Sequence, residues 1–124
     1  MILGIGNDLE CIERVKQMLV KLPKTATKIL TPTELAVFAE LSPKRQGEFL
    51  AGRFSAKEAY SKALGTGIGQ TVSFLDIEIL NDPLGRPYFS HHPLENECNA
   101  FISISHTKEH VATMVVLEKI KERR

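Results

Sequence analysis

Asp8 is the first residue whose surroundings indicate chemistry. It follows two glycines, Gly4 and Gly6, and in an extended strand these three residues would lie on one face. Two glycines on that face leave room for a ligand, or for another backbone segment, to approach the carboxylate. Mg²⁺ binds one or two carboxylates and completes its shell with water and phosphate oxygens. A simpler role is also open, because Asp8 could cap a helix that begins near Leu9.

A long helix expected in the middle of the chain carries a dense group of charged side chains. Arg53 and Lys57 lie one helical turn apart, and so do Glu58 and Lys62. One interpretation is a solvated, salt-bridged helix face. In the other interpretation, Glu58 joins Asp8 as a metal ligand and the three basic side chains hold phosphate groups.

Two further patterns resemble catalytic motifs but lack their context. The glycine run at residues 65–69 follows a helix, whereas a dinucleotide-binding fingerprint follows a strand, and the run lacks the ending of a P-loop. We expect a mobile loop there, or a turn with a close backbone approach. Ser105 and His106 would point to opposite faces of a strand, so we expect no nucleophile and base pair. His106 suits a structural hydrogen bond or a phosphate contact.

The segment from Arg14 to Lys28 contains five basic residues and no acid. Arg14, Met18 and Lys21 recur at helical spacing and share one face. A basic face with an exposed methionine suits the docking of an acidic, helical partner. An ordinary solvated helix fits this pattern equally well.

The length and composition limit the class of protein. The chain has 124 residues, which fits one domain over residues 1–124, and its 43% hydrophobic and 25% charged residues are typical of globular proteins. A net charge of +1 argues against a general nucleic-acid binder. Cys11 and Cys98 match no zinc-binding spacing and are expected to be free thiols. Neither a targeting segment nor a membrane span is visible, so we expect a cytoplasmic protein.

The elements that must position these residues are mainly helices in the first half of the chain and strands in the second. The patterns predict helices over residues 10–22, 25–30 and 43–64 and from Pro32 onward, and strands over residues 2–8, 74–80, 87–90, 101–105 and 111–117. Thr31 and Glu34 form a capping box, and Gly65 ends the longest helix. Short links between the later strands imply antiparallel pairing. The predicted class is α+β, with helices packed on an antiparallel sheet.

Taken together, the motifs resemble those of the bacterial holo-acyl-carrier-protein synthases, the short, single-domain members of the 4′-phosphopantetheinyl transferase family. The resemblance covers essentially the whole chain and implies the fold of that family. The segments that carry it are Gly4-Ile5-Gly6-Asn7-Asp8 with Arg14, Phe54-Ser55-Ala56-Lys57-Glu58-Ala59 with Lys62, Gly65-Thr66-Gly67-Ile68, Gly85-Arg86-Pro87 and Ser103-Ile104-Ser105-His106.

The resemblance implies an enzyme that transfers the 4′-phosphopantetheine arm of coenzyme A to a serine of apo acyl carrier protein. Adenosine 3′,5′-bisphosphate is the other product, Mg²⁺ is required, and the reaction serves fatty acid biosynthesis. By the same resemblance, Asp8 and Glu58 are the metal carboxylates, and Lys62 acts near the pyrophosphate or the nucleophile. The serine hydroxyl must lose a proton, either to Glu58 or to a water molecule on the metal.

The resemblance also implies a set of residues that contact coenzyme A. These residues are Lys44, Arg45, Arg53, Lys57, Gly65, Arg86 and His106. Arg53 and His106 are expected at its phosphates and Lys57 near the pyrophosphate or the nucleophile. The remaining basic members are expected at its 3′-phosphate and adenine end.

Protein partners are implied as well. The face formed by Arg14, Met18 and Lys21 would receive the acidic helix of the carrier protein. The short members of the family resemble one another in forming homotrimers with active sites between subunits. We expect the same assembly here, with no nucleic-acid or membrane partner.

Two other functions are open from the residues alone. A metal-dependent nucleotide phosphohydrolase would use the same two carboxylates to activate water. A non-catalytic module would bind coenzyme A or another nucleotide without turnover. The basic docking face favours the transferase, because a hydrolase acting on a nucleotide has no need of it.

Overall fold

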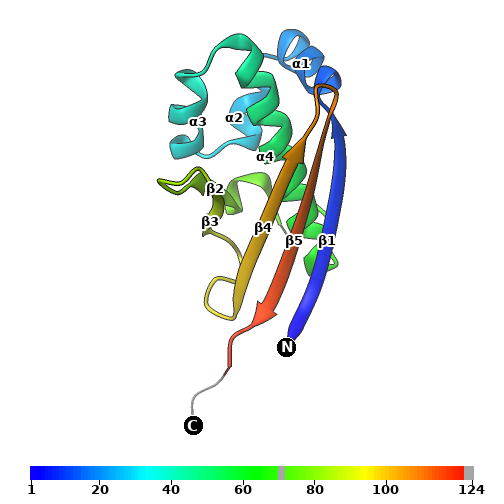
Figure 1. The fold of residues 1–124 in the computed structure, drawn as a ribbon, viewed down its shortest axis with the longest axis vertical. Helices are drawn as coiled ribbons and strands as arrows, with labels where there is room; N and C mark the ends of the chain where they lie inside the picture. Colours follow the sequence, from blue (N-terminus) through cyan, green and yellow to red (C-terminus); the bar gives the residue numbers. More distant parts are fainter. Residues whose placement is uncertain (70–71, 122–124) are drawn as a thin grey trace.

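The computed structural model describes residues 1–69 and 72–121. In chain order its elements are the strand β1 (Ile2–Cys11), the helices α1 (Ile12–Lys21), α2 (Thr25–Ile29), α3 (Pro32–Ala39) and α4 (Pro43–Leu64), the 3₁₀ turn η1 (Phe74–Asp76), and the strands β2 (Glu78–Asn81), β3 (Pro87–His91), β4 (Cys98–His106) and β5 (His110–Lys119). Helices in the first half and strands in the second confirm the α+β class (Figure 1). Within the described ranges, no helix is both long and apolar enough to cross a membrane.

An antiparallel sheet in the order β1-β5-β4 carries the long helix α4 on one face, while β2 and β3 form a separate hairpin. Helices α1, α2 and α3 gather around the N-terminal half of α4 (Figure 1). Spacing along the chain predicts the β4–β5 hairpin but no partner for β1. In the structure, β1 pairs with β5, so the first and last strands of the chain lie side by side.

Strand β1 lies very close to α4 because of its two glycines. A Cβ atom on Gly4 would come within 1.9 Å of the Ala63 carbonyl oxygen, and one on Gly6 would come equally close, 1.9 Å, to that of Ala59. Only a residue without a side chain fits such an approach. Helix backbone, not a ligand, therefore fills the space beside the glycines.

Local capping signals set the helix ends as predicted. The Thr31 hydroxyl and the Glu34 carboxylate form the capping box of α3. Gly65 ends α4 in a left-handed conformation with a φ of 87°. Gly67 and Gly69 also have positive φ, and no described atom lies within 4 Å of a Cβ placed on any of these three glycines. Their positive φ values fit a turn, but the turn lacks the close backbone approach that we expected as an alternative.

The strand predicted over residues 74–80 is wrong in its first half. This segment begins with η1, and β2 starts only at Glu78. Asp76 explains the difference, because its carboxylate accepts a hydrogen bond from the Ser73 amide at 2.9 Å and closes a turn. The first residues of the alternating apolar pattern therefore lie in a turn, and only the later ones lie in a strand.

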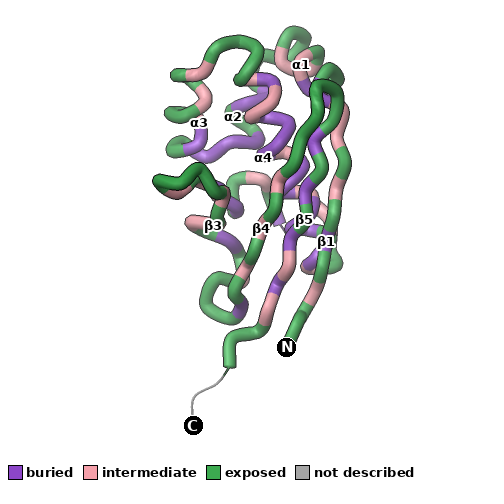
Figure 2. The backbone as a smooth tube through the Cα atoms, viewed as in Figure 1, coloured by how far each residue is buried: buried purple, intermediate pink, exposed green. Residues whose placement is uncertain are grey.

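The two faces of the sheet differ in burial. Buried residues concentrate along α4 and on the side of β5 that faces it, where apolar clusters form the core (Figure 2). The opposite face of the sheet exposes a band of large apolar side chains. Between 48% and 66% of the surface is exposed for Ile5, Leu9, Phe101 and Met114. This band is an unpartnered apolar surface.

A buried histidine after β3 is hydrogen-bonded to α4. The Tyr60 hydroxyl accepts a hydrogen bond from the Leu94 amide at 3.2 Å and shares a second hydrogen bond with His92 Nδ1 at 2.9 Å. Burial lowers the pKa of His92 from its ordinary value of 6.5, against the opposing effect of Glu95. The lowered pKa favours the neutral form of this buried imidazole.

We expect His92 to make the stability of the protein depend on pH. As the pH falls through about 6.5 the unfolded chain takes up a proton, whereas the folded chain resists protonation until its lower pKa is reached. The free energy of unfolding therefore falls with pH in this window. Between about pH 7.5 and about pH 5, urea denaturation should show a smaller loss of stability for His92→Gln than for the parent protein. The exposed neighbour gives the control His91→Gln, and equal losses in all three proteins would contradict the assignment.

Candidate active site

Asp8 and Lys62 meet where β1 packs on α4. Lys62 Nζ donates a hydrogen bond to Asp8 Oδ1 at 2.9 Å and another to the Asn7 carbonyl oxygen at 3.1 Å. The second carboxylate oxygen, Asp8 Oδ2, is buried and has no hydrogen-bond partner among the described residues. A buried carboxylate oxygen without a donor is costly, which makes it a candidate ligand for a cation.

These contacts decide two alternatives left open by the sequence. Asp8 does not cap α1, because the N-cap of that helix is Cys11 and no side-chain bond caps it. Lys62 pairs with Asp8 rather than with Glu58, so the solvated salt-bridge pattern predicted along the helix is not formed. Asp8 is therefore available for chemistry at the junction of strand and helix.

Two glutamates complete the charge distribution of this junction. Burial raises the pKa of Glu58, and the negative charges of Asp8 and Glu10 raise it further, while Lys62 opposes them. Burial also raises the pKa of Glu10, against the opposing effect of Arg14, which lies 3.6 Å away. Glu10 is not among the predicted site residues. Its position two residues after Asp8, on the same face of a strand, is the signal that could have indicated it.

This set of oxygen atoms fits a hard divalent cation. Mg²⁺ needs only one or two protein carboxylates when phosphate and water supply its other ligands. Over residues 1–69 and 72–121, no group of three His, Cys, Asp or Glu side chains could hold a metal by itself. The residues present therefore fit an ion that is bound partly by substrate, and they do not fit a closed structural metal site.

Two separate pockets border α4, one mainly on the strands of the sheet near its C-terminal end and one nearer its N-terminal end. The first, of about 610 Å³, is lined by Asp8 and Lys62. The second, of about 320 Å³, is lined by Arg45, Arg53 and His106. The two pockets share no lining residue. Ser105 lines the first and His106 the second, as expected for neighbours on opposite faces of a strand.

Comparison with known proteins identifies the family. A family described as the 4′-phosphopantetheinyl transferase superfamily matches residues 4–115. The chain belongs to this superfamily. Among its relatives, the holo-[acyl-carrier-protein] synthase of Geobacillus sp. (strain WCH70) is 48% identical over 97% of this chain and 99% of that protein. The holo-[acyl-carrier-protein] synthase of Bacillus subtilis (strain 168) is 49% identical over 97% of this chain and 98% of that protein.

Solved structures agree with the sequence relatives. The crystal structure of a holo-(acyl-carrier-protein) synthase from Bacillus anthracis in complex with CoA (3′,5′-ADP) superposes with a TM-score of 0.88 at 48% identity, covering 97% of this chain and 99% of that chain. The predicted 4′-phosphopantetheinyl transferase fold is confirmed. The protein is an enzyme of the transferase class.

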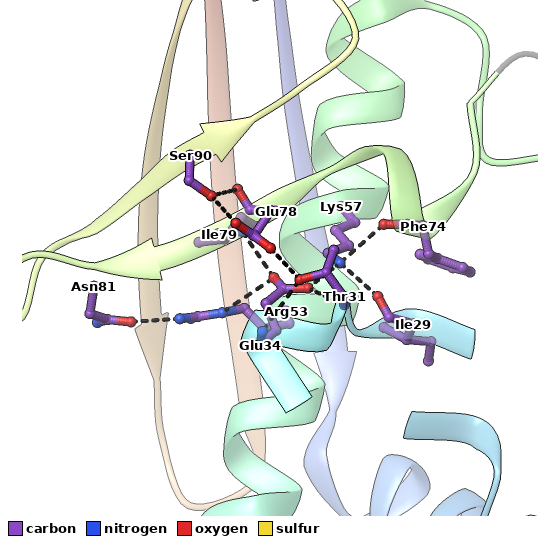
Figure 3. Close-up of polar contacts among 10 residues, drawn as sticks. All are labelled: Ile29, Thr31, Glu34, Arg53, Lys57, Phe74, Glu78, Ile79, Asn81 and Ser90. Carbon is purple, nitrogen blue, oxygen red and sulfur yellow. Dashed lines mark hydrogen bonds and ion pairs between the residues drawn. The ribbon is translucent and has the colours of Figure 1, made fainter. Parts of the chain in front are cut away.

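Lys57 of this transferase lies in the core. Its ammonium group donates to Glu34 Oε1 at 2.6 Å and to the carbonyl oxygens of Ile29 and Phe74 at 2.6 and 3.0 Å (Figure 3). Burial lowers the pKa of Lys57, against the opposing effect of Glu34. The side chain has 0% exposed surface in this structure, and its predicted contact with coenzyme A stays a prediction.

Arg53 approaches the same carboxylate from the side of the second pocket. Its guanidinium lies over the Phe49 ring at 4.4 Å, and its Nε is 3.9 Å from Glu34 Oε2. Nη2 donates to Asn81 Oδ1 at 2.5 Å, whereas Nε has no hydrogen-bond partner within the described residues. Burial lowers the pKa of Arg53 to about 10, so the side chain keeps its charge at neutral pH. Arg53 is a fixed positive charge that lines a pocket.

The other residues predicted at coenzyme A are spread over the surface. Lys44 is exposed and lines a third pocket together with His106. Arg86 is exposed in the β2–β3 turn and pairs with Asp82 at 3.2 Å. The Gly65 amide donates to carbonyl oxygens of the last turn of α4. The roles of Lys44, Arg86 and Gly65 stay predictions.

Helix α1 displays the predicted basic face. Arg14 and Lys21 are exposed, whereas Met18 is only half-buried rather than fully exposed. Val20 and Leu22 add apolar surface beside it, with exposures of 81% and 66%. These two residues are missing from the sequence predictions, and their apolar character in a basic segment is the signal that points to them.

We expect Lys57→Met to destabilise the protein strongly without altering its surface. The substitution leaves the Glu34 carboxylate buried without its ammonium partner, a change that costs about 3–5 kcal/mol in comparable buried pairs. Chemical denaturation should show this loss in the free energy of unfolding. Lys62→Met, on the half-exposed lysine of the same helix, is the control and should change stability by less than about 1 kcal/mol. Similar losses in the two variants would contradict a structural role specific to Lys57.

Proposed function

We propose that the pocket beside Asp8 is the active site of a holo-acyl-carrier-protein synthase. The protein transfers the 4′-phosphopantetheine moiety of coenzyme A to a serine of apo acyl carrier protein, in fatty acid biosynthesis. The products are holo acyl carrier protein and adenosine 3′,5′-bisphosphate. The observation that carries the site assignment is the buried, unpaired Asp8 Oδ2 beside Glu58 and Lys62. Residues 1–124 form a single domain in this proposal, and a cytoplasmic location stays a prediction.

Asp8 and Glu58 are the proposed ligands of Mg²⁺. Asp8 Oδ2 is free to bind, because the Lys62 ammonium occupies only Oδ1. When bound, a divalent cation at this place neutralises negative charge on the pyrophosphate of coenzyme A and on the leaving bisphosphate. Coenzyme A enters as a co-substrate that completes the shell of the ion.

Glu58 and Lys62 are the proposed catalytic residues. The serine oxygen of the carrier protein bonds to the β-phosphorus, the bond from that phosphorus to the bridging oxygen breaks, and the serine proton leaves to a base. Burial raises the pKa of Glu58, which makes its carboxylate a better proton acceptor. Lys62 is 51% exposed and close to Asp8, so its ammonium group can turn toward charge that develops on the leaving oxygen.

The basic second pocket is the proposed site for phosphates of coenzyme A. Arg53 is preset there by its buried contacts, and Arg45 and His106 line the same pocket. Lys44 and Arg86 extend this positive surface at either side in the proposal. Binding of an anion here needs no large rearrangement of Arg53, because its guanidinium is already desolvated and oriented.

The two pockets cooperate between subunits in the proposed homotrimer. Arg53 and Lys62 are nine positions apart on α4, which separates them by about 13 Å along the axis and by about half a turn around it. One chain therefore directs its basic pocket away from its own carboxylates. The exposed apolar band on the sheet, defined above by Ile5, Leu9, Phe101 and Met114, supports self-association that would bring the two kinds of pocket together.

Helix α1 is the proposed docking site for the carrier protein. Arg14 and Lys21 supply exposed positive charge for an acidic helix, and Met18 supplies an adaptable apolar contact. Val20 and Leu22 enlarge the apolar part of this surface. Arg14 also pairs with Glu10, so the docking surface adjoins the proposed metal site.

Intact-mass spectrometry tests the proposed reaction directly. Apo acyl carrier protein incubated with this protein, coenzyme A and Mg²⁺ should gain about 340 Da, the mass of the phosphopantetheine arm transferred in a metal-assisted reaction. Asp8→Ala and Glu58→Ala should remain folded and show no gain, because each lacks one carboxylate ligand. Full activity in either variant would contradict the assignment of both carboxylates.

The same experiment separates the transferase from the other two functions. Release of adenosine 3′,5′-bisphosphate without a gain in carrier mass would indicate a hydrolase. Binding of coenzyme A with neither product would indicate a non-catalytic module.

We expect two impaired variants, one without transfer activity and one with weakened binding of coenzyme A, to restore transfer activity to each other in mixed trimers at limiting coenzyme A. Asp8→Ala impairs the carboxylate pocket and Arg53→Met impairs the basic pocket, so co-expressed chains should form some intact sites between them. Random assembly predicts that about a quarter of the sites are intact. The measurement is transfer activity of the purified mixture. Asp8→Ala mixed with Glu58→Ala is the control and should stay inactive, because both changes lie in one pocket. Equal recovery in both mixtures, or none in the first, would contradict a site shared in this way.

A further inference from the structure

Asn81 connects the two elements that border the second pocket. It lies at the end of β2, with its side chain next to Arg53 of α4 (Figure 3). Its Oδ1 accepts a hydrogen bond from Arg53 Nη2 at 2.5 Å, and its Nδ2 donates one to the Gly85 carbonyl oxygen at 2.9 Å. One short, exposed side chain therefore ties a buried arginine to the β2–β3 turn.

Two further residues contact the Arg53 guanidinium. The Phe49 ring lies 4.4 Å under the guanidinium, and Glu34 Oε2 lies 3.9 Å from Nε. Glu34 itself cannot move, because it also accepts bonds from the Thr31 amide, the Ile79 amide and Lys57 (Figure 3). Phe49 and Glu34 limit the tilt and the depth of the guanidinium. Only Asn81 makes a hydrogen bond to its Nη2 end among the described residues.

We propose that Asn81 is a positioning residue, which fixes the Nη2 end of Arg53 so that the guanidinium is preset to bind a phosphate group of coenzyme A. This inference rests on the proposed function, in which the second pocket binds coenzyme A. Without Asn81, the Arg53 side chain can still lie on Phe49, but its terminal nitrogens lose their anchor in the plane of the ring. Binding must then order them again, which weakens affinity for the phosphate and leaves the chemistry at Asp8 and Glu58 unchanged.

Steady-state kinetics of Asn81→Ala test the proposal. We expect the KM for coenzyme A to rise roughly five- to tenfold, as for loss of a hydrogen bond to a charged group, with kcat changed by less than about twofold. The dissociation constant of adenosine 3′,5′-bisphosphate, measured by calorimetry, should rise by a similar factor. Asn81 is exposed, so the variant should fold. Asn99→Ala is the control, because Asn99, like Asn81, is an exposed strand residue. Its side chain donates one hydrogen bond, to Glu118.

A double-mutant cycle shows whether Asn81 acts through Arg53. In the Arg53→Met background, Asn81→Ala should not raise the KM for coenzyme A further, because the group that it positions is gone. If it still raises the KM, the residue acts through the Gly85 turn and the proposal is overturned. An unchanged KM for Asn81→Ala, with a raised KM for Arg53→Met, also overturns it while the proposed function stands. If Arg53→Met itself leaves the KM unchanged, the assignment of the second pocket to coenzyme A fails and the inference fails with it.

Discussion

The contact between the backbones of β1 and α4 determines where the chemistry of this protein can lie. Gly4 and Gly6 allow the strand to approach the Ala63 and Ala59 carbonyl oxygens to a distance at which any side chain would collide. Asp8 follows on the same face of the strand, so it must also point at the helix. The acid thus meets Lys62 and Glu58 through main-chain packing rather than through a loop. Rigid elements of this kind hold a site more accurately than loops do.

A second constraint acts in the core, where the Glu34 carboxylate has four partners. Its carboxylate caps α3 through the Thr31 amide, receives the β2 amide of Ile79, and pairs with Lys57 and Arg53 of α4 (Figure 3). A buried ionic cluster is weak evidence for stability, because desolvation offsets most of the attraction. In this protein the cluster mainly fixes the orientation of the Lys57 and Arg53 side chains. The Glu34 carboxylate pairs with Lys57 in the core and also limits how deeply the Arg53 guanidinium is buried. The packing of α3 against α4 therefore helps to determine the shape of the basic pocket.

Sequence patterns predict the structural features that depend on residues close together in the chain. They fail where residues far apart in the chain determine the environment of a side chain. The caps of α3 and α4 and the β4–β5 hairpin are local, and they appear as predicted. Arg53 and Lys57 look alike in the sequence as two basic residues one turn apart. Only the fold reveals that Glu34, 23 positions before Lys57, draws that lysine into the core. The turn at Asp76 is a failure of another kind, because a local side-chain bond to the Ser73 amide outweighs an alternating pattern. Glu10 escaped prediction although its position two residues after Asp8 is visible in the sequence, because its burial depends on the fold.

The geometry of α4 is the basis for the proposed contribution of a neighbouring subunit. Its 22 residues serve three surfaces at once: the sheet core, the carboxylate junction near the C-terminal end, and the basic pocket nearer the N-terminal end. Residues half a turn apart point to opposite sides of a helix. Coenzyme A carries phosphates at both its pyrophosphate and its ribose, and a site that binds both needs positive charge beyond the metal junction. In the proposed homotrimer, the basic surface of one copy supplies this charge beside the carboxylates of another. The apolar band on the sheet is where the burial that drives such an assembly is available. Activity and oligomerisation would then depend on the same surface, so that a chain too dilute to associate would lack both.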